Sequence, residues 1–169
     1  ALPILDDWES NKDRVKFIWH DFKAEIHNNV VLTAMIGEPD VILHVGASSH
    51  VDRSIEDPLS FVMDNVVGTC NILNYARFLP NLQKFIYFST DEIFGPAPKG
   101  VNYKEWDRYN SGNPYSASKA GGEELCLAFH NTYKIPIIRI NVMNAFGEKQ
   151  HVEKFIPSTK ETMRTFLRE

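Results

Sequence analysis

Residues 84–95 constrain the fold most, because an apolar run there changes abruptly into four polar side chains. The run at 85–88, Phe-Ile-Tyr-Phe, is rich in β-formers and is typical of a strand buried on both faces of a parallel sheet. Ser89, Thr90, Asp91 and Glu92 follow it directly. In open α/β sheets, ligands bind at the carboxyl edge of the strands, so we expect these four side chains to lie in a functional site.

Strand-like and helix-like segments alternate along the rest of the chain. Short apolar runs predict strands at 14–19, 41–45, 85–88 and 136–140. Helical spacing predicts a helix at 24–36. A capping side chain followed by proline, at Asp57-Pro58 and at Asn113-Pro114, predicts helices at 58–78 and 114–133, and Pro157 is expected to begin a further helix. Residues 95–112 lack periodicity and predict a long surface loop, a common form for lids and binding loops. This order predicts an α/β fold with a doubly wound parallel sheet.

The composition excludes several classes of protein. Hydrophobic residues make up 43% of the 169 residues, and the formal net charge is −4, which argues against a nucleic-acid polymer as partner. No apolar run approaches the roughly 18 residues that span a bilayer, so we expect no membrane segment. Cys70 and Cys126 stand alone in helical patterns and are expected to be small buried hydrophobes in a reducing compartment. We expect a cytoplasmic protein.

Two pairs of residues suggest acid–base chemistry. Tyr115 and Lys119 are four residues apart on a predicted helix and would share a face, where an ammonium lowers the pKa of a phenol. Such a pair can take a hydroxyl proton while hydride leaves the same carbon, although an exposed helix pair is the plainer interpretation. Asp91 and Glu92 are adjacent at the end of a buried strand, where repulsion and burial favour one acid and one base. An acidic loop or a helix cap is the alternative.

The six histidines do not predict a metal site. His44 and His50 have no third ligand at a usable spacing, and a hydrogen-bonded histidine at a strand edge explains each better. We therefore expect no metal.

Taken together, residues 89–95 and 113–120 resemble the extended short-chain dehydrogenase/reductases, and within them the dTDP-glucose 4,6-dehydratases. Residues 44–55, 65–69 and 153–157 carry the resemblance along nearly the whole chain. The Thr-Asp-Glu triplet is its specific part, because epimerase relatives typically have Ser-Ser or Ser-Ala there. The resemblance implies a Rossmann-like fold and NAD as cofactor.

The resemblance also implies roles for individual residues. Tyr115 would take the proton of the sugar 4-hydroxyl, with Lys119 lowering its pKa and holding the nicotinamide ribose. Thr90 would hydrogen-bond the same hydroxyl, and hydride would pass to NAD. Glu92 would then remove the C5 proton, Asp91 would protonate the departing 6-hydroxyl, and hydride would return to C6.

Binding residues follow from the same resemblance. The cofactor would contact Asp21 and Phe22 at its adenine, the backbone of Gly46, Ala47 and Ser49, and Ser89, Tyr115 and Lys119. The nucleotide-sugar substrate would contact His50, Thr90, Asn144 and Lys154. Relatives pair through a four-helix bundle, so we expect a homodimer through helices 58–78 and 114–133.

The chain departs from the family pattern at several positions. Gly46 replaces the usual Ala, Ser48 the usual Glu, and Asp64 the usual Thr before Asn65. Phe94 stands where Tyr is common, and residues 145–148 differ as well.

The Gly-rich turn that normally seats a dinucleotide pyrophosphate does not occur in this sequence. We therefore expect residues 1–169 to be part of an NAD-binding Rossmann-like domain, truncated at both ends. They would lack the N-terminal Gly-rich turn and the C-terminal substrate-binding part, and alone would bind little or no NAD. Two alternatives stay open, a nucleotide-sugar epimerase or decarboxylase of the same family and a non-catalytic remnant.

Overall fold

The computed structural model describes residues 13–143 and 145. Residues 18–143 form one unit, and the elements below belong to it. Its helices are α2 (Val30–Ile36), α3 (Val51–Glu56), α4 (Pro58–Val62), the π-helical turn η1 (Met63–Val67), α5 (Gly68–Ala76), the 3₁₀ turn η2 (Asp91–Phe94) and α6 (Pro114–Tyr133). Its strands are β1 (Val41–His44), β2 (Lys84–Thr90) and β3 (Ile137–Val142).

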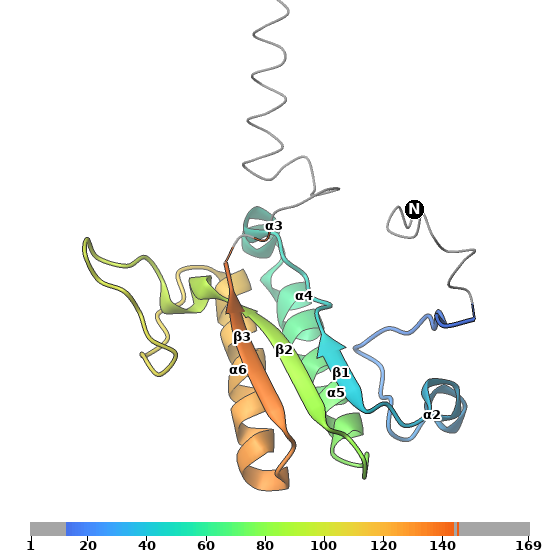
Figure 1. Ribbon diagram of the computed structural model, residues 1–169. Helices are drawn as coiled ribbons and strands as arrows, with labels where there is room; N and C mark the ends of the chain where they lie inside the picture. The colour runs from blue at the N-terminus through green and yellow to red at the C-terminus, as the bar shows by residue number, and fades with distance from the viewer. Residues whose placement is uncertain (1–12, 144, 146–169) are drawn as a thin grey trace, which may run out of the picture. The chain divides into compact units, whose positions relative to one another are not determined.

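The three strands form a parallel sheet in the order β1-β2-β3 (Figure 1). Parallel neighbours need a crossover connection, and here α4 to α5 link β1 to β2 while α6 links β2 to β3. The predicted α/β fold with a parallel sheet is confirmed, and the expected strands at 41–45, 85–88 and 136–140 are present with slightly different ends.

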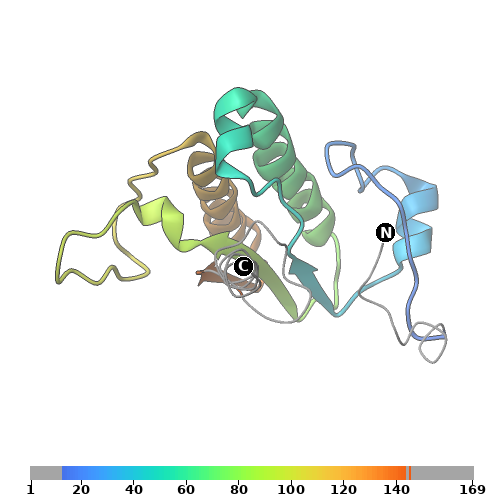
Figure 2. The same ribbon diagram turned by 90° about the horizontal axis from the view of Figure 1, so that it is seen from above.

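The helices α4, α5 and α6 lie on one side of the sheet (Figure 2). Phe85 and Tyr87 of β2 point to this side and are fully buried with Leu73 of α5 and Cys126 of α6. The opposite face of the sheet is also apolar, but four of its side chains are exposed, Val41, Leu43, Ile138 and Ile140. Among the described residues, therefore, β2 is covered on one face, where burial on both was predicted.

The two Asx-Pro pairs begin helices as predicted. The Asp57 side chain accepts a hydrogen bond from the Ser60 N–H at 3.2 Å and caps α4. Asn113 caps α6 in the same way, accepting from the Ser116 N–H at 2.8 Å. Both helices have proline at their first position, where the missing N–H costs nothing.

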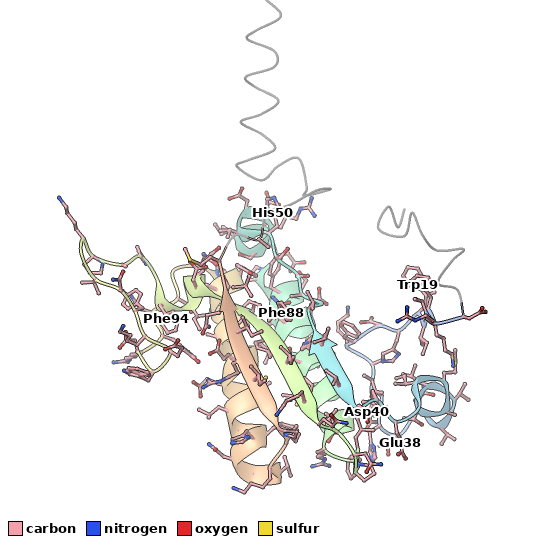
Figure 3. The ribbon with its side chains drawn as sticks, in the orientation of Figure 1. Trp19, Glu38, Asp40, His50, Phe88 and Phe94 are labelled. Atoms are coloured by element: carbon pink, nitrogen blue, oxygen red, sulfur yellow. The ribbon has the colours of Figure 1, made fainter. Side chains whose placement is uncertain are left out.

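Residues 14–19 do not form the predicted strand, and this prediction was wrong. A strand is stable only when a neighbour pairs with its backbone, and no described strand lies beside this segment. Figure 3 shows Trp19 on an irregular part of the chain, and its side chain is 94% exposed. The predicted helix at 24–36 is shorter, beginning at Val30 and ending before Gly37, which has the positive φ of 77° expected for a C-terminal cap.

Residues 95–112 form a long irregular segment, as predicted. Within the part of the chain that the structure describes, no helix is long and apolar enough to cross a membrane. The helix predicted from residue 157 lies outside the described residues.

Candidate active site

Two polar segments meet at the carboxyl edge of the sheet. β1 leads into residues 45–50, which have no regular structure, and β2 leads into η2. Because β1 and β2 are adjacent and parallel, both segments begin at the same edge (Figure 1). This is the place where open α/β sheets bind ligands.

The Thr-Asp-Glu triplet is held by hydrogen bonds at the end of β2. The Thr90 hydroxyl caps η2 by accepting the Glu92 N–H at 3.3 Å and donates to Asp91 Oδ1 at 3.4 Å. Glu92 Oε2 accepts a hydrogen bond from Asn113 Nδ2 at 3.3 Å, which ties it to the start of α6. Asp91 is half-buried and Glu92 is exposed, so both residues lie near the protein surface at the carboxyl edge of the sheet.

Tyr115 lies in the first turn of α6, close enough to Thr90 for the Thr90 hydroxyl to influence the pKa of its phenol. Its ring packs edge-on against Phe61 of α4, with 6.4 Å between the ring centroids. The structure therefore brings Thr90, Asp91, Glu92 and Tyr115 together, as the sequence predicts.

Lys119 follows one helical turn later and is only 4% exposed. Its Nζ donates to the Phe88 carbonyl at 2.6 Å and lies 4.3 Å from the centre of the Tyr87 ring. Burial penalises the ammonium and lowers the pKa of Lys119 to about 8, although the nearby Cys126 and Glu123 oppose this shift.

The lowering of the Tyr115 pKa that was expected from Lys119 is not seen in this structure. Burial raises the pKa of the Tyr115 phenol, and the neighbouring Glu92 and Asp91 carboxylates raise it further, while the hydrogen bond with Thr90 acts in the opposite direction. The Lys119 ammonium instead contacts the Phe88 carbonyl and the Tyr87 ring. Tyr115 is therefore a protonated phenol at neutral pH in this state.

A hollow of about 310 Å³ lies beside the turn that follows β1. Its lining residues are His20, Asp21, Phe22, Gly46, Ala47, Ser48 and Asp64. Four of them, Asp21, Phe22, Gly46 and Ala47, are predicted cofactor residues, and the structure gathers them in one place. A Cβ at Gly46 would lie 2.6 Å from the Phe22 ring, so a larger residue here would require that ring to move.

A charged cluster that the sequence analysis missed lies at this hollow. The Ser48 hydroxyl donates to Asp64 Oδ2 at 2.6 Å, and Lys23 Nζ lies 3.0 Å from both Asp64 Oδ1 and Asp21 Oδ1. The Ser48 hydrogen bond is the main reason that the pKa of Asp64 is lowered. Ser48 and Asp64, two of the departures from the family pattern, are therefore in direct contact.

Asn65 joins the hollow to the catalytic helix. It lies in η1, is buried, and accepts the Ser48 N–H at 2.8 Å. Its side-chain amide donates to the Ser48 carbonyl and to the Ser118 hydroxyl, each at 2.9 Å. Ser118 precedes Lys119, so one buried side chain fixes the turn after β1 against the middle of the site. The π-helical turn that places Asn65 is a rare form of helix, and the sequence did not predict it.

The interpretation of His44 as a hydrogen-bonded residue is confirmed. Its Nε2 lies 2.8 Å from the Thr69 hydroxyl, which itself donates to the Asn65 carbonyl at 2.6 Å, so the histidine is the donor. Burial lowers the pKa of His44 to about 4. Among residues 13–143 and 145, no three side chains of the metal-binding types are grouped to hold an ion.

The structure places the remaining predicted site residues in different surroundings, and two of them lie outside the described residues. The Ser89 hydroxyl is buried and has no hydrogen-bond partner among the described residues. Ser49 is exposed and does not line the hollow, and His50 begins α3 at the carboxyl edge (Figure 3). Asn144 and Lys154 lie outside the described residues.

Comparisons with known proteins agree with this geometry. The family model described as GDP-mannose 4,6 dehydratase matches residues 3–166. The dTDP-glucose 4,6-dehydratase of Xanthomonas campestris pv. campestris is 37% identical over 166 residues, covering 92% of this chain and 46% of that protein. The chain thus spans about half the length of the curated relatives it matches.

Solved structures give the same picture. The DesIV dTDP-glucose 4,6-dehydratase of Streptomyces venezuelae, solved with NAD and TYD bound, superposes with a TM-score of 0.74 at 32% identity, over 84% of this chain and 44% of that one. A UDP-glucuronic acid 4-epimerase of Bacillus cereus, in complex with UDP-glucuronic acid and NAD, has a TM-score of 0.79 at 25% identity, over 94% of this chain and 49% of that one.

Proposed function

Because this chain belongs to the GDP-mannose 4,6 dehydratase family, we propose that it is the catalytic part of an NAD-dependent nucleotide-sugar 4,6-dehydratase. The substrate would be dTDP-glucose and the product dTDP-4-keto-6-deoxyglucose. The observation that carries this proposal is the Thr90-Asp91-Glu92 triplet, which hydrogen bonds hold at the end of β2 beside Tyr115. An epimerase has no use for a paired acid and base at C5 and C6 of the sugar.

The first half of the reaction is the work of three residues. Tyr115 removes the proton of the 4-hydroxyl, and Thr90 beside it shares that hydroxyl. Burial raises the pKa of Tyr115, so the phenol needs a positive charge nearby before it can act as a base. Lys119, one turn along the same face of α6, would provide that charge once its ammonium turns from the Phe88 carbonyl toward Tyr115.

The second half removes water across C5 and C6. Oxidation at C4 makes the C5 proton acidic, and Glu92 takes it. Asp91 gives a proton to the 6-hydroxyl, which leaves as water. The position of both residues near the protein surface lets them reach a sugar that enters from solvent, and Asn113 holds Glu92 in place.

The residues present fit two parts of NAD. The hollow at Asp21, Phe22 and Gly46 is a place for the adenosine end, with an aromatic face and a carboxylate. The buried Ser89 hydroxyl, which has no partner among the described residues, and Lys119 suit the nicotinamide ribose. When bound, NAD supplies the hydride acceptor for C4 and the hydride donor for C6.

Product analysis tests the proposal. The complete protein would be incubated with dTDP-glucose and NAD, and the sugar product identified by NMR. We expect the 4-keto-6-deoxy sugar, and Asp91→Asn and Glu92→Gln should lose it while nucleotide binding is retained. Recovery of the C4 epimer would instead support the epimerase alternative and overturn this proposal.

The non-catalytic alternative has a separate test. Thermal unfolding of the complete protein would be followed as NAD is added, because a ligand that binds the folded state raises the midpoint. We expect NAD to raise the midpoint of thermal unfolding, and to raise it less in the Lys119→Met variant. No change at saturating NAD would favour a remnant that has lost the cofactor.

We also propose a cytoplasmic homodimer that pairs through the helices at 58–78 and 114–133. Leu59 of α4 is 68% exposed and Val62 is also exposed, which gives these helices an apolar outer surface. The unpaired cysteines Cys70 and Cys126 suit a reducing compartment. A monomeric mass in solution would contradict the dimer.

A further inference from the structure

Glu123 is a buried acid that the proposed reaction does not use. It lies on α6 one helical turn beyond Lys119 and is only 1% exposed. With Tyr115 and Lys119 it forms a row at four-residue spacing along one face of the helix. A buried carboxylate is costly unless it is paired and hydrogen-bonded, so its partners indicate what it holds in place.

Three side chains from two other segments of the chain satisfy Glu123. The Tyr109 hydroxyl donates to Oε1 at 2.8 Å, and Asn141 Nδ2 of β3 donates to Oε2 at 3.0 Å. The Arg139 guanidinium lies 3.4 Å from Oε1 and also donates to the Tyr109 hydroxyl at 3.3 Å. One carboxylate therefore joins α6, β3 and the long segment at 95–112.

The hydrogen bond between Glu123 and Asn141 connects Glu123 to Thr90, the first residue of the Thr90-Asp91-Glu92 triplet. Asn141 Nδ2, which donates to Glu123, also lies 3.5 Å from the Thr90 carbonyl. Asn141 pairs with Ser89 in the sheet register, so it stands beside the last residues of β2. Glu123 thus fixes the side chain that contacts the Thr90 backbone.

The hydrogen bond between Glu123 and Tyr109 connects Glu123 to η2, the turn that contains Asp91 and Glu92. The Tyr109 ring packs edge-on against Phe94, with 5.7 Å between centroids, and Phe94 is the last residue of η2. The Asn110 N–H donates to the Ile93 carbonyl at 2.8 Å in the same turn. Through Tyr109, Glu123 therefore holds the 3₁₀ turn that carries Asp91 and Glu92.

We propose that Glu123 is a positioning residue that sets the Thr90-Asp91-Glu92 triplet relative to Tyr115 and Lys119 on the same helix. It acts through Asn141 at one end of the triplet and through Tyr109 at the other. As a statement about catalysis this rests on the proposed function. The claim that Glu123 holds η2 and residues 109–111 in place depends only on the contacts described above.

The test compares Glu123→Gln and Tyr109→Phe with Glu124→Gln, a matched control at the neighbouring exposed acid of α6. Glutamine keeps the size of Glu123 but cannot accept hydrogen bonds at both ends, and phenylalanine removes only the Tyr109 hydroxyl. For Glu123→Gln we expect kcat to fall by about 10- to 100-fold with KM for the nucleotide sugar unchanged, as displacement by about 1 Å predicts. Glu124→Gln should match the wild type.

Amide hydrogen exchange gives a readout that does not depend on activity. The Gly95 and Asn110 amides, which donate to Glu92 and Ile93, should exchange roughly three- to tenfold faster in both variants than in Glu124→Gln. Amides in the middle of β2 should not change. Unchanged exchange at Gly95 and Asn110, or faster exchange throughout the domain, would overturn the proposal. An inactive wild-type protein would refute the proposed function, and exchange alone would then decide the role of Glu123.

Discussion

Replacing Lys119 by methionine should stabilise the folded protein near neutral pH, although it removes a residue that we propose to be catalytic. Burial lowers the pKa of this lysine from 10.5 to about 8. At about 1.4 kcal/mol per pKa unit, the buried ammonium costs roughly 3 kcal/mol of folding free energy at pH 7. Methionine has a similar shape without the charge, but it gives up the hydrogen bond to the Phe88 carbonyl, worth about 1 kcal/mol. We expect a net gain of about 2 kcal/mol.

The stability advantage of Lys119→Met over the wild type should decrease as the pH rises above 8. Below pH 8 the lysine is protonated in both the folded and the unfolded chain, so the full penalty is present. Between about pH 8 and 10.5 the unfolded chain keeps the proton that the folded chain has released, so the stability of the wild type rises with pH. Above pH 10.5 only the lost hydrogen bond remains, and the variant should be the less stable protein.

Urea denaturation of both proteins at pH 7, 8, 9 and 10, without added nucleotide, measures this difference. Lys99→Met, at an exposed lysine in the 95–112 segment, is the control and should change stability little at any of these pH values. If Lys119→Met were less stable than the wild type at pH 7, or if the difference were the same at every pH, the argument from burial would be refuted.

Three further substitutions test the supports of the site by urea denaturation. Gly46→Ala should cost about 1–3 kcal/mol because its methyl would lie 2.6 Å from the Phe22 ring, and a second change, Phe22→Leu, should recover most of the loss; full stability of the single variant would contradict the clash. Asn65→Ala should cost about 2–3 kcal/mol, since it leaves the half-buried Ser48 amide and carbonyl without their partner. Asn113→Ala should cost about 1 kcal/mol through the lost helix cap, and a neutral result would show that Ser116 caps the helix alone.

The parts of the fold that the sequence predicted have strong local signals. An apolar run followed by polar residues correctly located β2 and the turn after it, and a capping side chain before proline correctly located the starts of α4 and α6. The Thr-Asp-Glu triplet and Tyr115 could be predicted as neighbours because the ends of parallel elements meet at one edge.

The parts that were missed depend on distant contacts. Residues 14–19 have a strand-like composition, but a strand also needs a neighbour, which local sequence does not report. α3 begins at His50 without a side-chain cap, so it lacked the usual start signal. The raised pKa of Tyr115 depends on burial and on where the Lys119 ammonium points, and Glu123 is satisfied only by residues from other elements.

The π-helical turn at Met63–Val67 sets how this helix can change length during evolution or engineering. An α-helix turns by about 100° per residue, and a π turn contains one residue more than an α turn. Deleting one residue of this turn other than Asn65 would convert it into an α turn and keep the direction of the α5 side chains, so the buried Leu73 would stay in the core. A deletion elsewhere along the helix would rotate the residues beyond it by about 100°, and should therefore be tolerated far less well.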